Sequence, residues 1–127
     1  MIVLDASVLV AHLSPLDAHH TAATDLLLDR ADESWTVHMI TLAEVLVGGS
    51  KLGKGPEMLA DLKASGITLA PRDDDEALRL AELSAATGLK LPDCCVLDAA
   101  QTNAAQLATF DKALSTAASQ LGVTVIP

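Results

Sequence analysis

Aromatic residues are nearly absent from this chain of 127 residues, which has one Trp, one Phe and no Tyr. A hydrophobic core must therefore be built from aliphatic side chains, and hydrophobic residues make up 50% of the sequence. That fraction excludes the composition typical of disordered chains, and the length suits one core. We expect a single folded domain over residues 1–127.

Long apolar runs are also missing. The run Leu42–Val47 is interrupted by Glu44 and is far too short to cross a bilayer. The first residues, MIVLD, contain neither a basic segment nor an extended apolar one, so they do not resemble a signal peptide. We therefore expect a cytoplasmic protein without a membrane partner.

Cysteine is scarce too, and the two cysteines are neighbours, Cys94 and Cys95. Disulfide geometry strains a bridge between adjacent residues, and a lone CC pair is not a zinc-binding pattern. Free cysteines are usually buried, so we interpret both as small core side chains.

Basic residues are few: 8 Lys and Arg stand against 17 Asp and Glu, giving a net charge of −9. This balance argues against a broad basic surface for non-specific DNA binding. It does not exclude a nuclease, in which carboxylates hold a metal ion while a few basic residues contact phosphates.

Apolar runs of strand length alternate along the chain with longer segments of helical periodicity. The pattern predicts strands at residues 2–4, 35–39, 67–70, 106–109 and 123–126. It predicts helices at residues 7–13, 18–31, 41–49, 56–64, 77–87, 92–103 and 111–119. This alternation indicates an α/β fold, a three-layer sandwich with a mostly parallel sheet of four to five strands.

Four acidic residues occupy comparable positions in this pattern. Asp5 and Asp111 follow the first and fourth strands, and Glu44 and Asp93 lie in the first turns of predicted helices. In open parallel sheets, ligands bind outside the carboxyl ends of the strands, where these acids can converge. Carboxylates in one cleft repel each other unless a cation intervenes, and Mg²⁺ or Mn²⁺ suits such oxygen ligands.

Each acid also has an explanation that needs no function. Thr41 and Glu44 form a T-x-x-E capping box, and Asp93 is a favourable first-turn acid. Asp5 and Asp111 could cap helices. Asp5 is the least well explained in this way, because Ser or Thr would cap without the cost of burying a charge.

Four short motifs resemble those of the PIN-domain family. They are DAS at 5–7, TLAEV at 41–45, LPD at 91–93 and TFD at 109–111, in matching order and spacing across essentially the whole chain. The pattern is most similar to the VapC-type toxins of bacterial type II toxin–antitoxin pairs.

This resemblance implies an Mg²⁺- or Mn²⁺-dependent endoribonuclease with a cognate VapB-type antitoxin. It assigns the catalytic, metal-holding quartet to Asp5, Glu44, Asp93 and Asp111, with Ser7 and Thr109 as polar support. VapC-like proteins commonly pair, and a mean hydropathy of +0.38 also favours a homodimer. Asp98 departs from the family, which usually has a small or apolar residue there, and it need not join the quartet.

The remaining polar residues carry weaker expectations. RNA phosphates could be contacted by four lysines that lie near the motifs, although a solvated surface explains them equally well: Lys51, Lys54, Lys90 and Lys112. The four histidines lack ligand-like spacing, so we expect structural or surface roles. The acidic run Asp73–Glu76 is expected to complement a helix N-terminus.

Three other functions remain as alternatives. A PIN fold could persist as a catalytically silent binding module. A receiver-like phosphorylation module would need an acidic pair after the first strand and a Lys after the last, and Asp5 stands alone while Val125-Ile126-Pro127 contains no Lys. A haloacid-type phosphatase would need D-x-D where this chain has Asp5-Ala6-Ser7.

The expected mechanism is attack by a metal-activated water on an RNA phosphodiester. No Ser, Cys or His is placed as an activated nucleophile beside a base, so a covalent intermediate is disfavoured. Hydrolysis of this kind leaves a 5′-phosphate and a 3′-hydroxyl.

Overall fold

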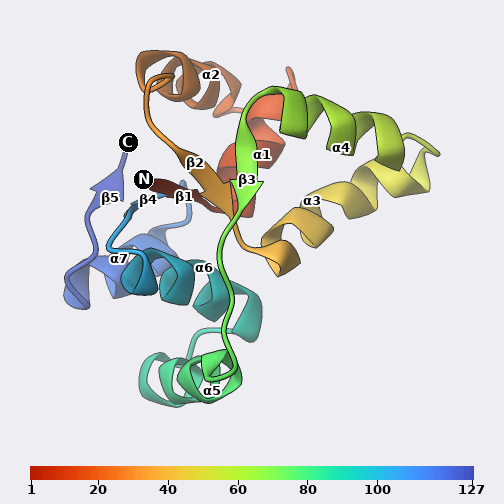
Figure 1. Cartoon of the computed structure of the whole chain (residues 1–127). Helices are drawn as coiled ribbons and strands as arrows, with labels where there is room; N and C mark the ends of the chain where they lie inside the picture. Colours follow the sequence, from red (N-terminus) through yellow and green to blue (C-terminus); the bar gives the residue numbers. More distant parts are fainter.

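The computed structural model describes residues 1–127 and contains five strands and seven helices in alternating layers (Figure 1). The strands are β1 (Ile2–Leu4), β2 (Trp35–Val37), β3 (Ile67–Leu69), β4 (Gln106–Ala108) and β5 (Val125–Ile126). The helices are α1 (Ala6–Leu13), α2 (His20–Asp29), α3 (Met39–Lys51), α4 (Gly55–Ala64), α5 (Glu76–Thr87), α6 (Leu91–Thr102) and α7 (Lys112–Gln120).

The five strands form one sheet in the order β3-β2-β1-β4-β5, and every neighbouring pair is parallel. The central strand β1 pairs with β2 through Ile2 and Trp35 and with β4 through Leu4 and Ala108. The predicted α/β class and the predicted parallel sheet are therefore confirmed.

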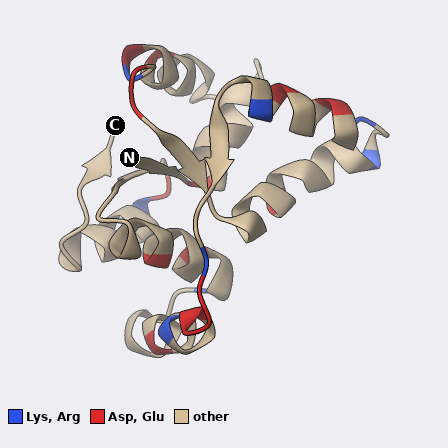
Figure 2. Ribbon diagram, viewed as in Figure 1, with Lys and Arg blue, Asp and Glu red and all other residues tan.

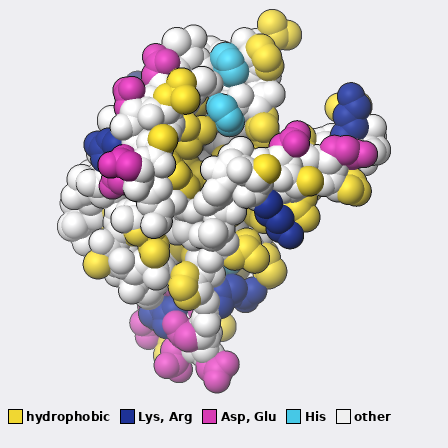
Figure 3. All heavy atoms as spheres, turned by 45° about the horizontal axis from the view of Figure 1, so that its top comes forward, with side chains coloured by type: hydrophobic (Ala, Val, Ile, Leu, Met, Phe, Trp, Pro, Cys, Tyr) yellow, Lys and Arg dark blue, Asp and Glu magenta, His cyan; other side chains and the backbone are white.

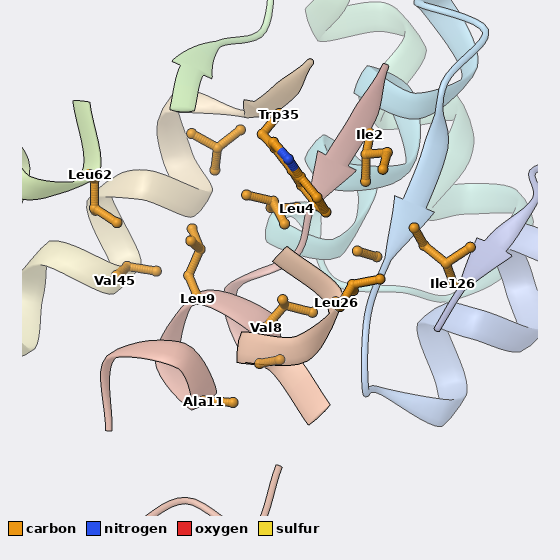
Figure 4. Packing of buried hydrophobic residues seen from close by; sticks show 13 residues of the cluster. Ile2, Leu4, Val8, Leu9, Ala11, Leu26, Trp35, Val45, Leu62 and Ile126 are labelled. Atoms are coloured by element: carbon orange, nitrogen blue, oxygen red, sulfur yellow. The ribbon is translucent and has the colours of Figure 1, made fainter. Parts of the chain in front are cut away.

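Helices cover both faces of the sheet. Successive side chains of β1 point to opposite faces, so this strand contributes to the core on each side. Ile2 and Leu4 enter a core cluster with residues of α1 to α4, and Figure 4 shows these aliphatic side chains packed around the ring of Trp35. Val3 enters a second cluster with residues of α6 and α7. The buried segment of β1 thus holds the two outer layers on one sheet.

The start of α3 differs from the prediction. β2 ends at Val37, and His38 caps α3 by accepting a hydrogen bond at Nδ1 from the Ile40 N–H (3.0 Å). Thr41 therefore lies inside the helix, fully buried, and its hydroxyl has no hydrogen-bond partner. The capping-box explanation of Glu44 is wrong, because the helix begins two residues before Thr41.

The end of α3 was also misplaced by the sequence pattern. Gly48 and Gly49 do not stop the helix, which continues to Lys51. A Cβ atom added at Gly49 would lie 2.9 Å from Cε of Met58 in α4. Gly49 therefore serves the close approach of two helices, whereas Gly88 ends α5 with φ +73° as the sequence predicted.

Cys94 and Cys95 are free and buried in α6, as expected. Burial, followed by the charge of Glu76, raises the pKa of the Cys95 thiol to about 11. Both thiols therefore stay protonated at neutral pH and act as core side chains. None of the helices combines the length and apolar character that a membrane crossing requires.

Candidate active site

The sheet reverses its direction of growth at β1. The chain moves from β1 to β2 on one side, and β4 later returns to the other side of β1. Such a switch point opens a crevice at the carboxyl ends of the strands, where α/β proteins bind ligands. Asp5 directly follows β1, and Thr109 and Asp111 follow β4, so the sequence places three polar residues at this point.

Asp5 is the buried acid of the predicted quartet, with 7% of its surface exposed. Its Oδ2 accepts hydrogen bonds from Ser7 Oγ (2.7 Å) and Thr109 Oγ1 (2.8 Å). Although Asp5 stands at the N-cap position of α1, its side chain makes no cap hydrogen bond. The capping explanation therefore fails for Asp5, whose carboxylate binds two hydroxyls instead.

The two hydroxyls that hold Asp5 also join the strand ends. Ser7 Oγ accepts a hydrogen bond from the Phe110 N–H, and Thr109 Oγ1 accepts one from the Asp111 N–H, both at 3.0 Å. Each hydroxyl thus donates to the carboxylate and accepts from the backbone beyond β4. This network fixes Asp5 relative to Asp111.

Asp111 is exposed and caps α7, because its Oδ1 accepts a hydrogen bond from the Leu114 N–H (3.0 Å). The capping explanation holds for this residue, but it leaves Oδ2 without an intramolecular hydrogen bond. Asp111 can therefore cap a helix and face the crevice at the same time.

Glu44 on α3 and Asp93 on α6 are electrostatically coupled to the acids at the ends of β1 and β4. Loss of solvent around the carboxyl group, and then the charges of Asp5 and Asp93, raise the pKa of Glu44. Burial, and then the charges of Asp5 and Asp111, raise the pKa of Asp93, while Lys90 opposes this shift. Glu44 and Asp93 are therefore both within electrostatic reach of Asp5, and Asp93 is also within reach of Asp111.

The acids differ in depth: Asp5 is buried, Asp93 is half-buried, and Glu44 and Asp111 are exposed. As they stand, no three acidic, histidine or cysteine side chains are grouped tightly enough to hold a metal ion. Glu44 and Asp111 are not locked by burial, and Oδ1 of Asp5 makes no hydrogen bond to protein. An all-oxygen set with excess negative charge fits a hard divalent cation.

Asp98, which departs from the family pattern, points away from the quartet. It is buried, and Arg79 of α5 binds both of its oxygens, from Nε to Oδ1 (2.8 Å) and from Nη2 to Oδ2 (3.1 Å). Asp98 therefore joins α6 to α5.

The acidic run before α5 was predicted only to complement a helix N-terminus, but Glu76 has a further role. Glu76 is buried, with one oxygen on His38 and the other on Arg72 Nε (2.8 Å). Burial alone would raise the pKa of Glu76, but the hydrogen bonds from Arg72 and His38 lower it. Sequence reasoning missed this contact, because nothing within the run Asp73–Glu76 distinguishes the buried acid from the exposed ones.

The histidines have structural roles, as expected. His20 Nδ1 lies 2.8 Å from the Ala11 carbonyl oxygen, and the His19 ring stacks on Phe110 with centroids 4.4 Å apart. The four lysines proposed as phosphate contacts are all exposed. Lys90 and Lys112 flank the acids in sequence, whereas Lys51 is the last residue of α3 and Lys54 lies in the turn between α3 and α4, where basic groups project from the molecule (Figure 2).

The molecule is an α/β protein with an all-parallel sheet, and acidic residues follow the strands on both sides of its switch point. The chain belongs to the PIN domain family, whose profile matches residues 2–119. No curated protein sequence gives a match.

Several solved structures share the fold. A toxin–antitoxin complex from Klebsiella pneumoniae is similar with 25% identity and a TM-score of 0.74, covering 87% of both chains. Mycobacterium tuberculosis VapC20, described as a Sarcin–Ricin loop cleaving toxin, gives 16% identity, a TM-score of 0.77, and coverage of 92% of this chain and 95% of its own. FitAcB from Neisseria gonorrhoeae is similar with 23% identity and a TM-score of 0.69, and the match covers 100% of this chain and 97% of its own.

Proposed function

We propose that residues 1–127 form one PIN domain that acts as an Mg²⁺-dependent endoribonuclease, the toxin of a type II toxin–antitoxin pair. The observation that carries this proposal is Asp5. It is a buried carboxylate at the switch point, bound by two hydroxyls instead of capping a helix. Relatives solved as toxins with the same fold support the choice of chemistry.

Each acid has a distinct part in this proposal. Asp5 and Asp93, the two with the least exposure, bind Mg²⁺ or Mn²⁺ directly. Glu44 and Asp111 complete the pocket, directly or through water. Lys90 and Lys112, exposed beside Asp93 and Asp111, are placed to contact phosphates of the RNA.

When bound, the metal ion supplies an activated water and offsets charge on the phosphate oxygens. The hydroxyl and thiol groups nearest the acids are held in structural contacts. The hydroxyls of Ser7 and Thr109 both donate to Asp5 and accept a backbone N–H. The buried Cys95 thiol stays protonated, and His38 is engaged by Glu76. These contacts favour direct hydrolysis over a covalent intermediate.

The products of cleavage test this proposal. Water adds to phosphorus and the bond to the 3′-oxygen breaks, so we expect fragments with a 5′-phosphate and a 3′-hydroxyl. End-group analysis of RNA treated with Mg²⁺ and the protein measures this directly. Cyclic 2′,3′-phosphate ends, or cleavage that persists in excess EDTA, would rule out the mechanism. Binding of RNA without any cleavage at saturating Mg²⁺ or Mn²⁺ would favour the silent binding module.

We further propose a cognate VapB-type antitoxin as partner. The relatives include VapBC2 from Rickettsia felis bound to a promoter DNA fragment. It is similar with 19% identity and a TM-score of 0.70, and the match covers 99% of this chain and 98% of its own. A cavity of about 370 Å³ between α1, α2 and α4, lined mainly by hydrophobic residues, offers a surface for a partner. A neighbouring reading frame without any short DNA-binding protein would count against this partner.

We also propose a homodimer. Large hydrophobic side chains are exposed at several places, including Leu16 (98%), Leu52 (74%) and Leu28 (69%), and apolar groups are spread over the face in Figure 3. Where such side chains form one contiguous patch, the patch usually marks an interface. Light scattering at micromolar concentration, without antitoxin, should give twice the monomer mass. A mass of about 13.1 kDa would contradict the dimer.

A further inference from the structure

Helix α5 is attached to the rest of the molecule in an unusual way. It lies outside the sheet layers, packed against α6 (Figure 1). A surface helix normally buries a stripe of aliphatic side chains. In α5 the half-buried Leu83 packs against the second core cluster, but the one fully buried residue is Glu76, a carboxylate at the first position of the helix. Charged groups of both signs gather on α5 and on the segment that leads into it (Figure 2).

Glu76 binds the cap of α3. The Nδ1 atom of His38 accepts the Ile40 N–H, so the proton of the neutral ring is assigned to Nε2, which donates to Oε1 of Glu76. Arg72 Nε donates to the second oxygen at 2.8 Å. The first turn of α3 is therefore fixed to the first turn of α5 through a single imidazole.

One turn further along α5, Arg79 binds α6. Its guanidinium holds both oxygens of the buried Asp98, at 2.8 Å and 3.1 Å, and both oxygens of Asp73, at 2.8 Å and 2.9 Å. Residues three apart lie on the same side of a helix. Glu76 and Arg79 thus present two ionic contacts from one turn of α5 to two different helices.

Both of those helices carry acids of the candidate site. Glu44 follows the His38 cap by six residues in α3, and Asp93 precedes Asp98 by five residues in α6. Like charges on Glu44, Asp93 and Asp5 act on one another. Their repulsion favours separation of α3 from α6, and the contacts of α5 oppose that separation.

We propose that α5 is a clamp that sets the spacing of Glu44 and Asp93 through the Glu76–His38 and Arg79–Asp98 contacts. This inference rests on the proposed metal site. Helix capping alone does not require it, since Ser or Asn would cap α3 without burying a carboxylate. Burial of ion pairs rarely gains stability over apolar packing, but it can fix one arrangement of elements. Glu76, His38, Arg79 and Asp98 are therefore positioning residues.

Calorimetric titration of the whole chain with Mn²⁺ tests the clamp. Glu76→Ala and Asp98→Ala should each weaken Mn²⁺ binding by about tenfold, the lower end of what groups that orient metal ligands contribute. The matched control is Leu26→Ala in α2, a core residue away from α5 that lowers stability without touching the clamp. Its Mn²⁺ affinity should equal that of the wild type.

Conservative variants separate positioning from long-range electrostatics. Glu76→Gln removes the same charge as Glu76→Ala but keeps an oxygen that can accept the His38 Nε2–H. It should keep most of the Mn²⁺ affinity. If Glu76→Ala does not fold, Arg79→Met at a half-buried position tests the second contact. It too should weaken Mn²⁺ binding by about tenfold.

A double-mutant cycle with Glu44→Gln identifies the acid through which the clamp acts. In the Glu44→Gln background, Glu76→Ala should cause no further loss of Mn²⁺ affinity. Additive losses, or clamp variants that bind Mn²⁺ as tightly as Leu26→Ala, would refute the clamp and leave the proposed nuclease intact. A wild-type protein that neither binds Mn²⁺ nor cleaves RNA would instead overturn the proposed function and the clamp with it.

Discussion

Asp5→Asn is expected to lose RNA cleavage by about a thousandfold or more. A metal ion contributes several kcal/mol of charge stabilisation to phosphoryl chemistry, and each 1.36 kcal/mol corresponds to a factor of ten in rate. Asp5 is the deepest acid and the one whose charge acts on both Glu44 and Asp93. Its neutralisation should therefore cost more than that of any exposed member of the quartet.

The fold should survive this change. The amide oxygen of Asn can replace Oδ2 and accept the same hydrogen bonds from Ser7 and Thr109. Circular dichroism and the melting temperature should stay close to those of the wild type. The matched control is Asp29→Asn, an exposed acid at the end of α2, which should cleave RNA at the wild-type rate. Full activity in Asp5→Asn would refute the site assignment.

Leu107→Ala is expected to lower the free energy of unfolding by about 2–5 kcal/mol, a large part of the stability of a domain this size. Leu107 is fully buried in β4 and packs in the cluster beneath α6 and α7. With almost no aromatic side chains in the chain, few large groups are available to fill the cavity that the truncation leaves.

Urea denaturation followed by circular dichroism measures this loss. Leu16→Ala is the control, because Leu16 is 98% exposed and its truncation should change the free energy of unfolding by less than about 0.5 kcal/mol. Equal losses in the two variants would show that the core is not where the structure places it.

The sheet could be predicted from sequence because its strands are short, mainly apolar runs, and three of them are followed by a polar residue at the carboxyl end. Ile2–Leu4 ending at Asp5 is the clearest example, and it also located the site. The signal depends on local composition and on a general property of parallel sheets. Both are visible without knowing which segments touch.

Helix α3 shows where local rules fail. The pattern Thr41–Glu44 matches a capping box and Gly48-Gly49 matches a helix end, yet the helix begins at Met39 and ends at Lys51. The cap is His38, held by Glu76 from a distant part of the chain, and Gly49 faces Met58 of α4. Tertiary contacts decided both ends, and a local pattern cannot contain them.

The same limit applies to the partners of Asp98 and Glu76. The sequence shows that both residues are acidic and which predicted helix each belongs to. It does not show their ion pairs, which depend on how α5 packs against α6 and against the start of α3. Only the assembled structure shows that these acids face away from the quartet and join the helices that carry it.

If Asp5, Glu44, Asp93 and Asp111 form a site for a divalent cation, the protein binds that cation through Asp5. Calorimetric titration of Mn²⁺ into the wild type and into Asp5→Asn, side by side at neutral pH, measures this binding. We expect saturable binding to the wild type, weakened by at least about tenfold in Asp5→Asn. Equal affinity in the two proteins, or no binding to the wild type, would show that these acids do not form a cation site.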